Sequence, residues 1–260
     1  MDWLVNTLEA EIIPRLMATY ASDPDRNNAG GPRAVQPEEV LTFTDIALYR
    51  EPSDCRQFVD SIQHRGIPLH AIYLDLITPA ARTLGHLWTD DRCDFTQVTV
   101  ALWRMQQIMY DLSPMFQLGQ GSVQAKPHAI MLMPVPGSQH TLGILMVAEF
   151  FRRSGWKVWG DPTADRERLL DAVHDEPFDL AGISIGSEVH ITPLNDFIED
   201  LRRHSRNHAL QVMVGGPLLH HQPELKNAIR ADIFSTDAQH AVSVAEGIVA
   251  TTSSASVACR

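Results

Sequence analysis

The sequence of 260 residues lacks the basic surface of a protein that grips nucleic acid directly. Lys and Arg total 21 against 32 Asp and Glu, which gives a net charge of −11. A domain that holds a phosphate backbone normally carries a basic stripe, because each phosphate contact pairs a cation with an anion. The densest basic clusters, Arg152-Arg153 and Arg202–His204, are instead typical of solvated helix faces. Direct DNA binding is therefore disfavoured, whereas binding to a protein that holds DNA stays open.

Long apolar runs and paired cysteines are also missing. No stretch approaches the roughly eighteen apolar residues of a membrane span. The start of the sequence is acidic and helical in period, without the basic and apolar regions of a signal peptide. The three cysteines, Cys55, Cys93 and Cys259, are far apart and form no CxxC or disulfide pattern. We expect reduced thiols in a cytoplasmic protein.

The first half of the sequence has helical periodicity throughout. Residues 1–35 combine an amphipathic segment with a linker rich in Pro, Gly and Asn. Four or five helices are expected within residues 36–118, with helix ends at Gly66–Pro68 and at Ser113-Pro114. Because short turns join them, they favour a compact helical bundle.

The second half alternates short apolar runs with amphipathic helices. Such alternation predicts β-α units on a parallel sheet. We expect a flavodoxin-like or Rossmann-like α/β domain with five strands over residues 126–250, followed by a disordered tail over residues 251–260. The five strand-like runs are HAIMLMPVP, WKVWG, FDLAGISIG, LQVMVGG and ADIFS.

The loops after these strands are the places to look for a site, because open α/β sheets bind ligands outside the carboxyl ends of their strands. No glycine-rich phosphate loop follows the first strand, which disfavours nucleotide cofactors. That loop carries His140 instead, and Gly143 follows it. An imidazole there can bind a metal while its other nitrogen bonds to a neighbour. A glycine at a helix start lets a bulky group approach the backbone.

The four loops together resemble those of the cobalamin-binding domain family. Its signature is Asp-x-His-x-x-Gly after strand one, a Ser motif after strand three and Gly-Gly after strand four. The order and spacing agree over four loops, those after strands one, three, four and five. The matching stretches are Ser138-Gln139-His140-Thr141-Leu142-Gly143, Ser184-Ile185-Gly186-Ser187, Gly215-Gly216 and Ser235-Thr236.

This resemblance implies a bound cobalamin (adenosyl-, methyl- or hydroxocobalamin), with His140 as the lower axial ligand of cobalt. It places the dimethylbenzimidazole tail in a narrow slot beside the sheet, where Gly143, Gly215 and Gly216 leave room. Hydroxyl groups of the third and fifth loops would line that slot. Ser138 stands where the family has Asp, so His140 lacks its carboxylate partner. Haem is therefore an alternative, since a related domain family uses the same His position for iron.

The helical half resembles the four-helix cap that covers cobalamin in methionine synthase and in light-sensing cobalamin repressors. Trp88 falls where the family places a Trp over the upper axial ligand, although a core aromatic of the bundle is the alternative. Val98 and Thr99 replace the repressors' Glu-His pair, so that upper-face His is absent. Helical geometry more often points His86 away from the upper face. The implied cofactor-binding residues are Trp88, Val98, Thr99, Ser138, Gln139, His140, Thr141, Leu142, Gly143, Ser184, Ile185, Ser187, Gly215, Gly216, Ser235 and Thr236.

The cap, the His loop and the phrase AEFFRRSGWKVWG together resemble the AerR/PpaA antirepressors of photosynthetic bacteria. The resemblance implies a light-responsive transcriptional regulator that is not an enzyme. It would act through a partner protein, a repressor of photosynthesis genes, and reach DNA only through that partner. A corrinoid methyl carrier with the same layout is a further alternative.

Overall fold

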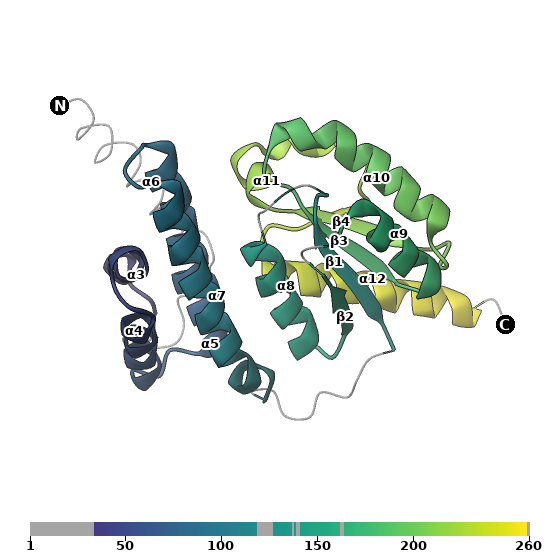
Figure 1. The fold of residues 1–260 in the computed structure, drawn as a ribbon. Coiled ribbons are helices and arrows are strands. Elements are labelled where there is room, and N and C mark those ends of the chain that lie inside the picture. The colour runs from purple at the N-terminus through teal and green to yellow at the C-terminus, as the bar shows by residue number, and fades with distance from the viewer. Residues whose placement is uncertain (1–33, 119–126, 137, 139–140, 162–163, 259–260) are drawn as a thin grey trace.

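The computed structural model describes residues 34–118, 127–136, 138, 141–161 and 164–258. The chain forms a helical part followed by an α/β domain, as the sequence predicts (Figure 1). The helical part consists of α3 (Pro37–Tyr49), α4 (Pro52–His64), α5 (Leu69–Ala71), the π-helical turn η3 (Ile72–Ile77), α6 (Thr78–Thr89) and α7 (Phe95–Leu118).

A proline explains the π-helical turn between α5 and α6. Pro79 lies in the first turn of α6, and its ring would clash with the carbonyl group one turn earlier in a regular helix. The widened turn η3 ends directly before it, and Thr78 donates from its backbone N–H and its hydroxyl to the carbonyl of Tyr73. The chain therefore stays helical from Leu69 to Thr89.

The predicted helix end at Ser113-Pro114 is wrong. Helix α7 continues to Leu118 with Pro114 inside it. Tertiary contacts hold this last turn: the ring of Phe116 is fully buried, with its centroid 4.5 Å from that of Tyr73 and 5.1 Å from that of Phe150. Packing therefore outweighs the hydrogen bond that a proline removes from a helix.

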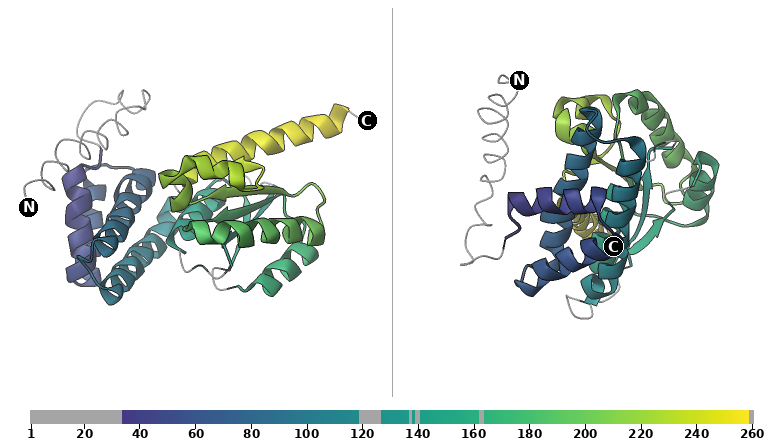
Figure 2. Two further views of the ribbon diagram at one scale, coloured as in Figure 1. Left: turned by 90° about the horizontal axis from the view of Figure 1, so that it is seen from above. Right: turned by 60° about the vertical axis from the view of Figure 1, so that its left-hand side comes forward.

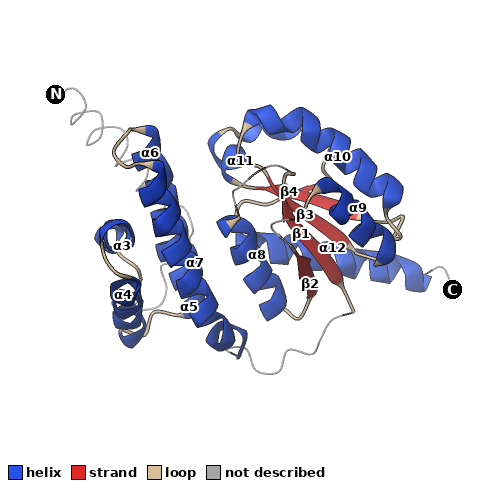
Figure 3. Cartoon of the chain, viewed as in Figure 1, coloured by secondary structure: helices blue, strands red, loops and turns tan. Residues whose placement is uncertain are grey.

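The α/β domain contains one parallel sheet, coloured red in Figure 3, with the strand order β2-β1-β3-β4-β5. This is the flavodoxin-like order. The sequence left open whether the sheet is flavodoxin-like or Rossmann-like, and the strand order decides between them. The strands are β1 (Ala129–Pro134), β2 (Lys157–Gly160), β3 (Leu180–Ser184), β4 (Gln211–Gly215) and β5 (Ile233–Phe234).

Helices cover both faces of the sheet (Figures 1 and 2). Alternate residues of β1 point to opposite faces: Ile130 and Leu132 pack with α8 and α12, whereas Met131 and Met133 pack with α9 and α10. The helices of the domain are α8 (Leu142–Arg153), α9 (Arg166–Asp175), the short turn η4 (Glu188–His190), α10 (Ile191–His204), α11 (Pro217–His221), η5 (Pro223–Ala228) and α12 (Ala238–Ala258).

The helical part packs on α8. Helix α7 lies alongside α8 in Figure 1, and the apolar residues of both belong to one hydrophobic cluster. This cluster continues under the sheet face that α12 covers. The two parts of the molecule therefore share a core.

Helix α12 extends beyond the end that the sequence predicts. It runs to Ala258, so helix replaces the expected disordered tail over residues 251–258. The segment contains no Gly or Pro that would stop a helix. Within the described part of the chain, no helix has the length and apolar character to cross a membrane.

Candidate functional site

The carboxyl ends of the strands meet at one edge of the sheet. In the parallel register, Pro134 pairs with Ser184 and Ser184 pairs with Gly215. The N–H of Ser235 donates to the carbonyl of Val214 at 3.1 Å. The helix after β1 covers one face and the helix after β3 covers the other, so the chain changes direction between these neighbours. Flavodoxin-like sheets bind ligands at such a switch point.

The loop after β1 is described in part. The N–H of Ser138 donates to the carbonyl of Val135 at 2.9 Å, and Thr141 precedes the first turn of α8. Gln139 and His140 lie outside the described residues. The role of His140 as axial ligand therefore stays a prediction.

Gly143 presents bare backbone to open space. It is exposed in the first turn of α8, and a Cβ added to it would meet no atom within 4 Å. The neighbouring side chain of Leu142 is half-buried and packs against the core. A bulky group can therefore approach the backbone of α8 at Gly143.

The two glycines after β4 are required by their own neighbours. A Cβ on Gly216 would lie 2.5 Å from the carbonyl oxygen of Ile185, and its φ of +118° favours glycine. A Cβ on Gly215 would lie 2.8 Å from Oγ of Ser235. The close approach of the strand ends thus explains both glycines without a ligand. The slot for the nucleotide tail that the resemblance implies is a second explanation.

The loop after β3 places two hydroxyl groups at the switch point. Ser184 is half-buried, and its carbonyl accepts from the N–H of Val135 at 3.0 Å. Ser187 is half-buried at the start of η4. Ile185 between them is fully buried in the core, so its side chain contributes packing.

The last loop is more open. Ser235 is half-buried against Gly215, and Thr236 is exposed with its hydroxyl donating to Asp237 at 3.2 Å. A hydroxyl held by an exposed carboxylate is free to exchange that partner for another.

The helical part supplies Trp88 at the end of α6. Its side chain is 51% exposed, which excludes the alternative in which it is a core aromatic of the bundle. Val98 is half-buried and packs against the core. Thr99 is exposed, and its hydroxyl donates to the carbonyl of Phe95 within α7 at 2.8 Å.

Among the described residues, two contacts join the helical part to the carboxyl edge of the sheet. The rings of His86 in α6 and His221 in α11 have centroids 6.0 Å apart, so His86 faces the α/β domain. Gln106 of α7 donates to Oγ1 of Thr141 at 3.3 Å. Partial burial, with the nearby charges of Arg82 and His221, lowers the pKa of His220. No pattern in the sequence reveals these pairs, because they join distant elements.

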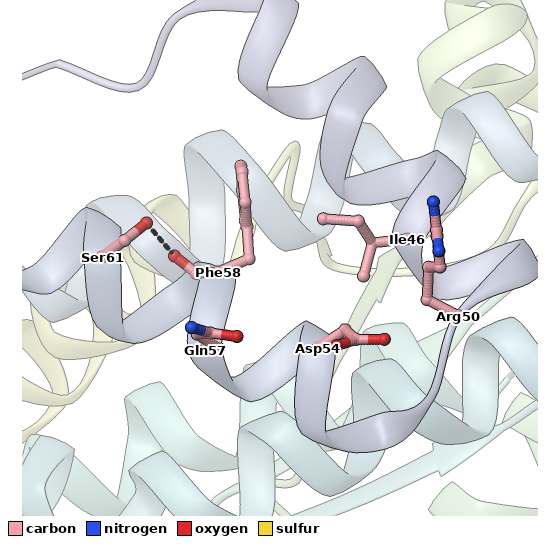
Figure 4. A pocket seen from close by; sticks show the side chains of 6 residues that line it. All are labelled: Ile46, Arg50, Asp54, Gln57, Phe58 and Ser61. Atoms are coloured by element: carbon pink, nitrogen blue, oxygen red, sulfur yellow. Dashed lines mark hydrogen bonds between the residues drawn. The ribbon is translucent and has the colours of Figure 1, made fainter.

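A groove elsewhere on the protein differs from the sheet edge in its lining. A groove of about 430 Å³ lies between α3 and α4, away from the sheet edge (Figure 4). Arg50 and Asp54 give this groove one positive and one negative charge. In the described ranges, no three His, Cys, Asp or Glu side chains are grouped to hold a metal ion. The groove is lined by Ile46, Arg50, Asp54, Gln57, Phe58 and Ser61.

Comparisons with known proteins agree with the fold and the loops. The B12 binding domain family matches residues 129–245. A 20.5 kDa protein of Rhodobacter capsulatus, called uncharacterized and encoded in the bchF-crtJ intergenic region, is 28% identical over 181 residues, covering 68% of this chain and 92% of that protein.

A solved structure gives the same result for the architecture. The Methanosarcina barkeri monomethylamine corrinoid protein superposes with a TM-score of 0.68 at 15% identity, covering 82% of this chain and all of that one. At this identity the likeness concerns the fold alone. It includes the helical part as well as the sheet.

The described residues fit a cobalamin at the sheet edge. Gly143 offers open backbone, and Ser184 and Ser187 offer hydroxyls. The family match covers all four loops that the sequence singled out. Residues 129–245 are therefore similar to the B12 binding domain family, and a helical part precedes them.

Proposed function

We propose that this protein binds cobalamin and acts as a light-responsive regulator of transcription in the cytoplasm. It would do so as an antirepressor, through a partner protein that represses photosynthesis genes, and without enzymatic activity of its own. His140 would be the lower axial ligand of cobalt.

The observation that carries the regulatory part of this proposal is the relative in Rhodobacter capsulatus. That protein is encoded beside bchF and crtJ, in a photosynthesis gene region, and this chain spans 92% of its length. The charge supports an indirect route to DNA, since a net charge of −11 repels a phosphate backbone.

The arrangement of the two parts supports a sensor. Contacts from α6 and α7 reach the carboxyl edge of the sheet at His221 and Thr141, so a ligand bound there would touch both parts. An alkylcobalamin supplies a cobalt–carbon bond that light can break. Trp88 would cover its upper side, and the loss of an upper group would change how α6 and α7 rest on the edge. The helical part would then have two positions, one with and one without the upper group. A regulator requires such an element with two stable states.

The test is reconstitution in the dark with adenosylcobalamin, hydroxocobalamin or haemin, followed by ultraviolet–visible spectra before and after illumination. We expect retained cobalamin, a spectral change of the adenosyl form on illumination, and loss of the lower-ligand signature in His140→Ala. Lys157→Ala, an exposed change on β2, serves as a control that should leave the spectra unchanged.

Other outcomes point to the alternatives. A Soret band with haemin and no retained cobalamin would replace the proposal with a haem sensor that uses the same His. Transfer of methyl groups to and from the bound corrinoid by a methyltransferase would identify a methyl carrier.

A further inference from the structure

The outer face of the α3–α4 pair carries apolar side chains that stay exposed or half-buried in the described part of the chain. Leu41 is 57% exposed and Tyr49 is 60% exposed, and both lie on α3. Ile46 lies beside Tyr49, because residues three apart share one side of a helix. The half-buried ring of Phe58 continues this surface onto α4. Single exposed apolar residues are ordinary, but a group that spans two helices is typical of an interaction surface.

This surface is hollowed. The groove of about 430 Å³ lies between α3 and α4, and Figure 4 shows Phe58 and Ile46 reaching into it from the two helices. Arg50 also lines the groove, and its guanidinium group has no ion-pair partner among the described residues. The groove therefore suits an apolar ridge that has a carboxylate at its side.

The first twenty residues of the sequence, which lie outside the described residues, have this pattern. Glu9 and Glu11 flank an apolar stripe, and Pro14 can bend a helix without ending it, as Pro114 does inside α7. The stripe recurs at every fourth position, the period of one face of a helix, and consists of Leu4, Leu8, Ile12 and Leu16.

The connection to α3 keeps this segment close to the groove. The described chain begins at Ala34, just before the start of α3 at Pro37. The linker over residues 21–33 is rich in Pro, Gly and Asn, and a flexible linker of that length spans about 20 Å on average. Helix α3, with 13 residues, is also about 20 Å long. The segment is therefore within reach of the whole groove at a high effective concentration, an advantage that a separate partner lacks.

We propose that residues 1–20 pack as an amphipathic helix in the groove between α3 and α4. Their apolar stripe would contact Ile46, Tyr49 and Phe58, and a carboxylate at its side would lie next to Arg50. The groove lies away from the sheet edge, so this contact does not depend on bound cobalamin. It adds one helix to the helical part and covers the outer apolar face within the same chain.

The test is urea denaturation of the full-length protein, followed by circular dichroism, with variants on both sides of the contact. We expect Leu8→Asp and Tyr49→Ala each to lower the urea midpoint. The double variant should lower it no further than the larger single effect, because both changes remove one contact. Tyr110→Ala is the matched control, since its side chain is 56% exposed on α7, and its midpoint should equal that of the wild type.

Hydrogen exchange locates the contact. In Leu8→Asp, the amides of α4 around Phe58 should exchange about tenfold faster than in the wild type, the effect of losing one buried leucine side chain on local opening. The amides of α10 should exchange at the wild-type rate. Unchanged exchange in α4 would overturn the proposal.

Three results of the denaturation experiment would also overturn it. The first is a midpoint of Leu8→Asp equal to that of the wild type. The second is a lowered midpoint in Tyr110→Ala that does not add to that of Leu8→Asp, which would place the segment on α7. The third is a wild-type midpoint that rises with protein concentration, which would assign the groove to a second copy of the chain. None of these measurements uses cobalamin, so the proposed function is tested separately.

Discussion

The two ends of α8 differ in how they meet the helical part. At the end of the helix, Glu149 is 8% exposed and accepts hydrogen bonds from Ser113 at 2.6 Å, from Gln117 at 2.8 Å and from Arg152 at 2.9 Å. At its start, Gly143 faces open space, and the nearest described polar link is the 3.3 Å bond from Gln106 to the residue before the helix.

The two ends of α8 therefore have different roles: the end of the helix holds the helical part, and its start is accessible to a ligand. Two of the three donors, Ser113 and Gln117, belong to α7. Their buried acceptor therefore fixes α7 against α8, because moving either helix would leave these donors unpaired. Arg153 adds to this end by stacking over the ring of Phe116 at 4.3 Å. The start of α8 lies at the sheet edge and keeps its backbone accessible. The molecule therefore has one closed end that sets the geometry and one open end that can receive a ligand.

Removing the acceptor at the closed end should have the largest effect. Glu149→Ala removes the acceptor of the half-buried Ser113 and one of the two acceptors of Gln117, so we expect the free energy of unfolding to fall by about 2–3 kcal/mol. Urea denaturation followed by circular dichroism measures it. Glu176→Ala is the matched control, because its partner Lys157 is exposed and such surface pairs contribute about 0–1 kcal/mol. Equal losses of stability in the two variants would contradict the role of Glu149 in fixing α7 against α8.

Adding a methyl group at the open end should leave stability almost unchanged and affect binding. Gly143→Ala meets no atom and favours the helix, so the free energy of unfolding should stay the same or rise by up to about 1 kcal/mol. The Kd for cobalamin should rise about tenfold if the corrin ring approaches this backbone, as measured by equilibrium dialysis. Gly247→Ala, also helical and also open, should not alter binding. Unchanged affinity in Gly143→Ala would place the ligand elsewhere.

The smallest expected effect is on the pH dependence of stability, through His220 in α11. Partial burial lowers the pKa of His220 in the folded protein, with Arg82 and His221 adding to the shift. The unfolded chain therefore binds a proton more readily, and stability falls as the pH drops through the ordinary histidine pKa of about 6.5. The loss levels off below the folded pKa. His220→Gln should flatten this part of the stability profile, measured by denaturation between pH 7.5 and 5.5. An unchanged slope would assign the pH dependence to other groups.

Much of the fold could be predicted because its signals are local. The apolar runs of the second half alternate with amphipathic helices, and all five became parallel strands. The end of α7 could not be predicted in this way. Ser113-Pro114 is a reliable stop in isolation, yet the burial of Phe116 and the bonds to Glu149 carry the helix past it.

The candidate site, too, could be predicted from the sequence only in part. The loops that carry Ser138, Ser184, Gly215 and Ser235 were identified from their positions after strands, and the register places their strand ends side by side. The pair of His86 and His221 was missed, because a contact between distant elements leaves no trace in a sequence pattern. It becomes visible only when the elements are packed together.

The sequence by itself determined the order of helices and strands, the parallel sheet and the loops that follow the strands, since hydrophobic period and turn residues act over a few neighbours. The tertiary structure alone decided the strand order, the exposure of Trp88, the contact of His86 with His221 and the bonds of Glu149. These features join residues that are far apart in the chain. Their energies depend on which groups are buried together, and only the packed molecule fixes that.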